Sequence, residues 1–191
     1  MRDVLTAGGV VKRDYVAAFV RVLRARHDEV ADAEFGLHAA RTYGRETDAE
    51  HRGHTYADTV ETVNRTAACG ILTGGHVILG LPGETHDEII AQAAELSRLP
   101  LTTLKMHQLQ LIRGTKMARE FECRPEDFHL FSVDEYIDLV IDYVEHLRPD
   151  LILERFVSQS PKELLIAPDW GLKNYEFTAR VQKRMKERGA Y

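Results

Sequence analysis

The sequence contains few residues of the kind that hold metal ions or clusters. Only two of its 191 residues are cysteines, and they lie far apart in the chain. We expect Cys69 near the end of a helix and Cys123 in a polar loop. Two isolated thiols cannot form a structural zinc site or hold an iron–sulfur cluster by themselves. The nine histidines include no His-Glu-x-x-His pattern, so the residues alone predict no metal site. We expect both thiols to be reduced and the protein to be cytoplasmic.

Long apolar runs and glycine-rich loops are also missing. The first residues lack the apolar core of a signal peptide, and no segment approaches the roughly 18 consecutive apolar residues of a membrane span. No glycine-rich run is followed by Lys-Ser or Lys-Thr, which argues against a phosphate cradle of the Walker or dinucleotide-binding type. The formal net charge of -5 gives no general attraction to nucleic acid. We therefore expect no membrane association and no strong nucleic-acid signal.

What the sequence does have is the composition and periodicity of a globular α/β protein. Hydrophobic residues make up 44% and charged residues 29% of the chain, which is ordinary for a folded domain. Apolar runs and breaking residues predict strands at 71–81, 102–112 and 151–157, and helices at 14–30, 55–69, 85–99, 132–148, from 160 onward and at 173–188. This alternation favours a parallel sheet with right-handed crossovers. Three strands are few for an independent sheet, so the pattern indicates half a barrel or a domain with open edges.

Capping residues mark the starts of several predicted helices. Thr85 with Glu88, and Ser132 with Glu135, have the spacing of a capping box. Ser160-Pro161-Lys162-Glu163 is a further helix start, with proline at its preferred first position. The stretch before residue 52 is less regular. There, 35–37 could end a short strand, and 41–52 is polar.

The segment 78–85, Ile-Leu-Gly-Leu-Pro-Gly-Glu-Thr, ends the first clear strand. Ligands of parallel α/β folds bind at the C-terminal ends of the strands. Gly80 has no side chain, so a flat ligand could approach the backbone closely there, and Pro82 with Gly83 turns the chain sharply. Glu84 falls near a helix N-terminus, which favours its negative charge. The same residues are also those of an ordinary turn and helix cap.

This segment resembles the adenine-side strand of radical S-adenosylmethionine (SAM) barrels, of the group that includes methylthiotransferases, coproporphyrinogen dehydrogenases and the elongator catalytic subunit. Other segments, in order, are similar to one uncharacterised bacterial family of that group. They are 52–57, 104–107 with 112–115, and 155–158 through 170–174. The resemblance covers about residues 52–188.

The resemblance implies the C-terminal portion of a radical SAM (β/α) partial barrel, similar to a TIM barrel, with parallel strands alternating with helices. It implies a divergent N-terminal segment over 1–51 and the barrel part, with a terminal helix, over 52–191. The implied chemistry is reductive cleavage of SAM by a [4Fe-4S] cluster, which makes a 5′-deoxyadenosyl radical that abstracts hydrogen. The residues expected at the cofactor are Ile78, Leu79, Gly80 and Gly83.

Three side chains are candidates for contacts with substrate. Lys105 and His107 stand two apart on a predicted strand and share a face, which points either into the barrel or to solvent. Arg155, which is followed by Ser158-Gln159-Ser160, could bind an anionic group or pair with a nearby carboxylate or helix end. The basic residues of 173–188 could meet RNA, but such charge usually complements a helix C-terminus. The sequence predicts no particular catalytic residue and no oligomeric state. It also does not indicate whether the substrate is a small molecule or RNA.

The sequence departs from the family in two places. The family holds its cluster with three closely spaced cysteines ahead of the first barrel helix, and no such triad is present. Residues 34–37 resemble a family strand that is usually followed by a cofactor-facing glutamate, but here the next residue is His38. A truncated, frame-shifted or degenerate gene, or a misassigned start, would produce this pattern.

Three functions therefore remain open from the sequence. The first is a radical SAM protein that is truncated or divergent in this chain. The second is a non-catalytic remnant or binding module that keeps the second half of the barrel. The third is an α/β domain that binds an adenine nucleotide without iron.

Overall fold

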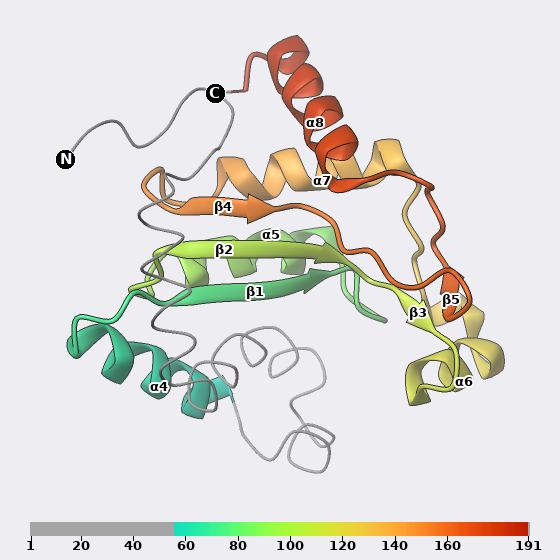
Figure 1. Ribbon diagram of the computed structural model, residues 1–191, viewed down its shortest axis with the longest axis horizontal. Helices are drawn as coiled ribbons and strands as arrows, with labels where there is room; N and C mark the ends of the chain where they lie inside the picture. The colour runs from blue at the N-terminus through green and yellow to red at the C-terminus, as the bar shows by residue number, and fades with distance from the viewer. Residues whose placement is uncertain (1–55, 191) are drawn as a thin grey trace. The chain divides into compact units, whose positions relative to one another are not determined.

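The computed structural model describes residues 56–190 (Figure 1). Several expectations concern residues outside this range. They are the helix at 14–30, the strand end at 35–37, His38 in place of the family's glutamate, and the polar stretch at 41–52. The same holds for most of the similar segment at 52–57.

Six helical segments and five strands form within the described part of the chain. The helices are α4 (Tyr56–Ala68), α5 (His86–Leu96), α6 (Lys116–Cys123), the 3-10 turn η1 (Pro125–Asp127), α7 (Val133–Glu145) and α8 (Asn174–Arg188). The strands are β1 (Gly74–Leu79), β2 (Thr103–Gln108), β3 (Leu111–Ile112), β4 (Ile152–Arg155) and β5 (Leu165–Ala167).

The sheet that organises the fold has the strand order β1-β2-β4, and its three strands run in the same direction (Figure 1). Helix α5 connects the first two strands, and the segment containing α7 connects β2 to β4. The prediction of an α/β fold with parallel strands and helical connections is confirmed. A separate antiparallel pair, β3 with β5, places Leu111 opposite Ala167 and Ile112 opposite Leu165.

The described residues divide into two compact units. The first combines 56–77, 94–105 and 148–154, and the second combines 78–93, 106–147 and 155–190. In the first unit the backbone N–H of Thr102 donates to the carbonyl of Thr73 at 2.7 Å, and the N–H of Ile152 donates to the carbonyl of Thr102 at 3.1 Å. These bonds join the starts of the three strands, so the sheet is in register from its first residues.

Alternating burial along the strands follows directly from the sequence. In β1, Val77 and Leu79 are buried while His76 and Ile78 are half-buried, and β2 repeats this pattern with Leu104 and Met106 buried. Side chains of a strand point alternately to its two faces. β1 and β2 therefore each put one face into the apolar core.

In the second unit, an aromatic cluster adds to the core beside α7. Tyr136 and Phe177 are fully buried, and their ring centroids lie 5.6 Å apart. The hydroxyl of Tyr136 donates to the carbonyl of Phe156 at 3.0 Å. Burial raises the pKa of this phenol well above its ordinary value, so it remains a neutral hydrogen-bond donor.

The predicted caps of two helices are confirmed. At α7, the N–H of Glu135 donates to the hydroxyl of Ser132, and the N–H of Ser132 donates to the Glu135 carboxylate at 2.8 Å. At α5, Thr85 and Glu88 make the same reciprocal pair of bonds. Each cap satisfies two backbone N–H groups that the helix itself cannot pair.

Two local predictions are wrong. The helix predicted from Ser160 onward is instead a turn, in which the N–H of Leu164 donates to the carbonyl of Pro161, and the chain continues into β5. The apolar run of β5 pairs with β3, and this long-range pairing outweighs the local start signal. Cys123, expected in a polar loop, is the last residue of α6, which Thr115 caps.

No helix within residues 56–190 is both long enough and apolar enough to cross a membrane.

The α7 cap predicts a pH dependence of stability. Hydrogen bonds from the backbone and hydroxyl of Ser132 hold the pKa of Glu135 below its ordinary value. A carboxyl whose pKa is depressed by folding stabilises the protein above its unfolded pKa, and this contribution is lost as the pH falls through its folded pKa. Glu135→Gln should therefore lower the melting temperature at neutral pH, and the difference from the unaltered protein should vanish in acid.

Thermal melts from pH 7 down to pH 3 measure this difference. Glu126→Gln is the matched control, because it removes the same charge from an exposed residue of η1 outside the cap. If the melting temperature of Glu135→Gln stayed equally far below that of the unaltered protein in acid, the depressed pKa of Glu135 would not be the cause of the difference.

Candidate functional site

The candidate site lies at the C-terminal ends of the strands within the second unit. There β1 leads into the turn 80–84, β2 ends at Gln108, and β4 leads into the loop 156–164. This end of a parallel sheet is where α/β folds bind their ligands.

Glu84 organises the turn that follows β1. Its Oε2 accepts the backbone N–H groups of Gly80 at 3.2 Å and Leu81 at 2.8 Å, and its Oε1 accepts the side-chain amide of Gln92 at 2.7 Å. The N–H of Gly83 donates to the carbonyl of Asp127 at 3.1 Å. Sequence reasoning gave Glu84 only a favourable place near a helix N-terminus. Its larger role is to hold the backbone of the turn.

A side chain of the same unit, that of Phe131, leaves no room for a Cβ at Gly80. Its φ is +85°, and a Cβ added there would lie 2.5 Å from Cε2 of Phe131. The ring of Phe131 therefore occupies the space that a flat ligand was expected to use. The planar group that lies beside Gly80 is thus a side chain of the chain itself, and the approach of a flat ligand to this backbone stays a prediction.

The other residues expected at the cofactor occupy different environments. Leu79 is fully buried, and its carbonyl accepts the N–H of Leu109 at 3.0 Å. Ile78 is half-buried on the opposite face of β1. Gly83 has a φ of +75° and no atom within 4 Å of an added Cβ, so only its backbone conformation requires glycine. The adenine-binding role of these residues stays a prediction.

The substrate-side candidates lie on β2 and β4. Lys105 and His107 are both half-buried and alternate with buried neighbours, so they do share a face of β2. Lys105 pairs with Glu154 at 3.5 Å, within the first unit. Arg155 is half-buried, and its Nε is a buried donor without a hydrogen-bond partner in the described part of the chain. Their contact with a substrate also stays a prediction.

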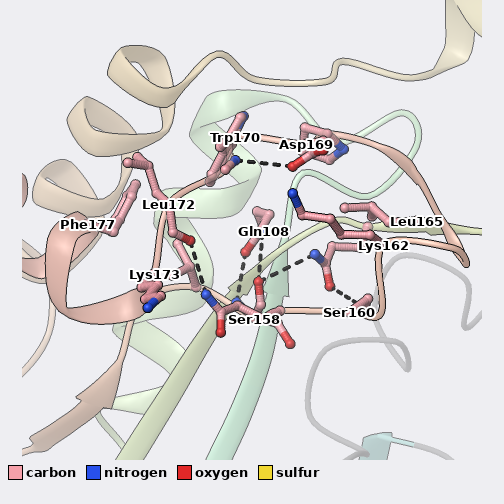
Figure 2. Close-up of a pocket in the computed structure, with 15 residues that line it drawn as sticks. Gln108, Ser158, Ser160, Lys162, Leu165, Asp169, Trp170, Leu172, Lys173 and Phe177 are labelled. Atoms are coloured by element: carbon pink, nitrogen blue, oxygen red, sulfur yellow. Dashed lines mark hydrogen bonds between the residues drawn. The ribbon is translucent and has the colours of Figure 1, made fainter.

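A pocket of about 380 Å³ opens between the end of β2 and the segment 157–173 (Figure 2). Its floor is a side-chain clasp. The amide of Gln108 donates to the carbonyl of Ser158 at 3.1 Å and accepts the N–H of the same residue at 3.0 Å. Gln108 is only 6% exposed, so the clasp is protected from water. Sequence reasoning missed Gln108 because nothing in a single strand reveals its partner in a loop 50 residues later.

Further polar side chains extend this floor. The hydroxyl of Ser160 donates to Oε1 of Gln110 at 2.9 Å, and Gln159 donates to the carbonyl of Leu172 at 3.2 Å. The walls are apolar and include Trp170 and Phe177, whose rings stack with an interplanar angle of 10° and centroids 5.9 Å apart. The pocket therefore combines a rigid polar floor with an aromatic wall.

A second hollow, of about 640 Å³, borders the turn after β1. It is lined by Phe131 and by several carboxylates, including those of Asp138 and Asp142 on α7. Arg184 of α8 binds both carboxylate oxygens of Asp138 at 2.9 Å, and His86 lies 3.2 Å from Asp142. Arg184 thus offsets the charge of Asp138, and Arg188 of α8 pairs with Asp142.

The cysteines do not supply a cluster site. Both Cys69 and Cys123 are exposed thiols, and among residues 56–190 no group of three histidine, cysteine or acidic side chains is arranged to hold a metal ion. The donor set present in this sequence therefore does not fit a [4Fe-4S] cluster.

Comparisons with known proteins define the family. Residues 101–187 match the radical SAM C-terminal domain. The chain is 33% identical over 141 residues to the uncharacterised protein YtqA of Bacillus subtilis, with 74% of this chain and 43% of that protein covered. It is 33% identical over 73 residues to a biotin synthase of Streptomyces avermitilis, with 38% of this chain and 19% of that protein covered.

The fold agrees with these matches. The solved structure of Elp3 from the archaeon Methanocaldococcus infernus superimposes with a TM-score of 0.63 at 17% identity, and covers 74% of this chain and 33% of that chain. At this identity the likeness concerns the fold. The chain belongs to the radical SAM superfamily, of which it carries the C-terminal part. The chain spans less than half the length of YtqA and of similar curated relatives, of which 43% is covered.

A pair of glycine substitutions tests the packing at the turn. Gly80→Ala should destabilise the protein by about 2–5 kcal/mol, because it adds a contact with Phe131 to the cost of a left-handed backbone. Gly83→Ala, three residues away, should cost only about 1–2 kcal/mol, since an added Cβ meets nothing there.

Urea unfolding of both variants measures the two free energies. Equal losses would show that Phe131 does not restrict the space at Gly80.

Proposed function

We propose that this chain provides the ligand-binding C-terminal part of a radical SAM fold in the cytoplasm, and that alone it binds its ligands without cleaving SAM reductively. The observation that carries the proposal is the cysteine set. The chemistry of the family needs three closely spaced thiolates, while this sequence contains two cysteines in all. Both are exposed, one following α4 and one ending α6.

The ends of the strands support the ligand-binding half of the proposal. Glu84 fixes the turn after β1, and the Gln108–Ser158 clasp fixes the loop after β4. Preorganised loops on a rigid sheet are the usual way in which α/β folds build a binding site. Ile78, Leu79, Gly80 and Gly83 are the proposed cofactor side of the site.

Lys105, His107 and Arg155 are the proposed substrate side. The first two share one face of β2. The third carries a buried guanidinium N–H that an anionic group of a ligand could accept.

The names of the relatives agree with a SAM-related role but name no substrate for this chain. YtqA is uncharacterised, and the biotin synthase match covers 38% of this chain. SAM and a [4Fe-4S] cluster are therefore proposed for the family to which the chain belongs. For this chain, the cluster would require cysteine ligands that its own sequence does not contain.

Anaerobic reconstitution tests the proposal. The full chain is incubated with ferrous iron and sulfide, and iron, sulfide and 5′-deoxyadenosine are measured after addition of SAM and dithionite. We expect less than one four-iron cluster per chain, and no more 5′-deoxyadenosine than the Cys69→Ser/Cys123→Ser double variant produces.

A stoichiometric cluster with SAM cleavage that is lost in the double variant would overturn the proposal. Iron retained equally by both proteins, without SAM cleavage, would be adventitious binding and would support it.

A further inference from the structure

The charges at the mouth of the Gln108–Ser158 pocket have no counterpart in the sequence motifs. Lys162, on the turn before β5, and Lys173, directly before α8, are both exposed and both line the pocket. Neither ammonium makes an ion pair with a carboxylate of residues 56–190. The carboxylate of Asp169 also lines the pocket, and it accepts the N–H of Gly171 at 3.1 Å. The pocket therefore has an excess of positive charge in a molecule whose formal net charge is -5.

The hydrogen-bonding groups of the pocket are also unbalanced. The amides of Gln108 and Gln110 each have two N–H groups, and one from each is used on the carbonyl of Ser158. The hydroxyl of Ser158 makes no hydrogen bond within the described part of the chain. Together with six N–H groups on the two ammoniums, these leave many donors. Two of the acceptors, Oε1 of Gln108 and Oε1 of Gln110, already accept a hydrogen bond.

Several of the other residues that line the pocket are apolar. Trp170 and Leu165 face the space above the clasp, and Figure 2 shows Trp170 and Lys162 around the Gln108–Ser158 pair. The indole N–H of Trp170 is engaged, since it donates to the carbonyl of Phe131 at 3.1 Å. The indole therefore offers the pocket its ring surface. The volume of about 380 Å³ lies in the range of small-molecule sites.

We propose that this pocket binds a small organic anion, in which a carboxylate or phosphate group is joined to an apolar body. The anionic group lies between Lys162 and Lys173 and accepts from Gln108, Gln110 and the hydroxyl of Ser158. The apolar body packs against Trp170. This inference deepens the proposed function, and rests on it, by naming the class of ligand at the ends of β2 and β4.

The pocket contains its own reporter, because Trp170 is the only tryptophan in the sequence. The full chain is titrated with phenylacetate and with phenyl phosphate, which separate the carboxylate and phosphate sources of the anion. Binding is followed by tryptophan fluorescence and independently by calorimetry. Phenylacetamide is the matched neutral probe, and acetate and inorganic phosphate are anions without an apolar body.

We expect one of the two aromatic anions to bind at least about tenfold more tightly than phenylacetamide and than either bare anion. The Lys162→Gln/Lys173→Gln double variant should raise its Kd about tenfold, because two exposed charge contacts are lost. Lys183→Gln is the matched control and should leave the Kd unchanged, since Lys183 is an exposed lysine of α8 that pairs with Glu187. Melting temperatures of all variants establish that they are folded.

Equal binding of the amide and the anions, or a Kd unchanged in the double variant, would overturn the inference. So would a Kd above about 1 mM for both aromatic anions. The titration uses no iron, so its failure is distinct from failure of the proposed function. A chain that assembles a cluster overturns the proposed function even if the anion binds, whereas a chain without a cluster and without anion binding overturns this inference alone.

Discussion

The clasp between Gln108 and Ser158 is the interaction on which the candidate site depends. A side-chain amide carries the same donor and acceptor as a peptide group, so Gln108 extends the hydrogen bonding of β2 beyond its backbone. The partner is the loop that follows β4, and this loop continues to the aromatic wall of the pocket. Because Gln108 is buried, loss of the amide would leave the backbone N–H of Ser158 unpaired at a cost of about 1–3 kcal/mol, while the carbonyl of Ser158 would keep only the 3.4 Å bond from Gln110.

Glu84 holds the turn that follows β1 through side-chain hydrogen bonds, as Gln108 at the end of β2 holds the loop that follows β4. Its carboxylate accepts two backbone N–H groups of the turn and one side-chain amide. Bonds to a charged acceptor are stronger than bonds between neutral groups, so the turn is held in one conformation. That conformation places Gly80 against Phe131, and it leaves the N–H groups of Gly80 and Leu81 already paired. A ligand at this turn must use other groups or displace these contacts.

The family and the chemistry of the chain are therefore separate findings. The radical SAM C-terminal domain and the parallel sheet place the chain in the superfamily. The reductive step of that superfamily depends on three thiolates. The match over residues 101–187 concerns the fold, and the sequence contains only two cysteines. In the described residues, Glu84 and Gln108 hold the segments that follow the strands, and a pocket rich in hydrogen-bond donors lies beside the end of β2. Ligand binding is the activity that we propose for these side chains.

Much of the fold could be predicted from local signals. Capping boxes located the starts of α5 and α7, and the apolar run at 71–81 located β1, because each of these signals depends on residues close in the chain. The errors arose where distant segments meet. Ser160-Pro161 has a valid local helix start, but the following apolar residues pair with β3 instead.

The sequence by itself determined the parallel α/β fold, its family and the shortage of thiolates, because periodicity, motif spacing and residue counts are properties of the chain alone. Only the tertiary structure decided which side chains build the site. Phe131 reaches Gly80, and Gln108 reaches Ser158, across 51 and 50 positions of sequence. Such partners are set by packing and by the need to pair buried polar groups, and neither is visible in a local pattern.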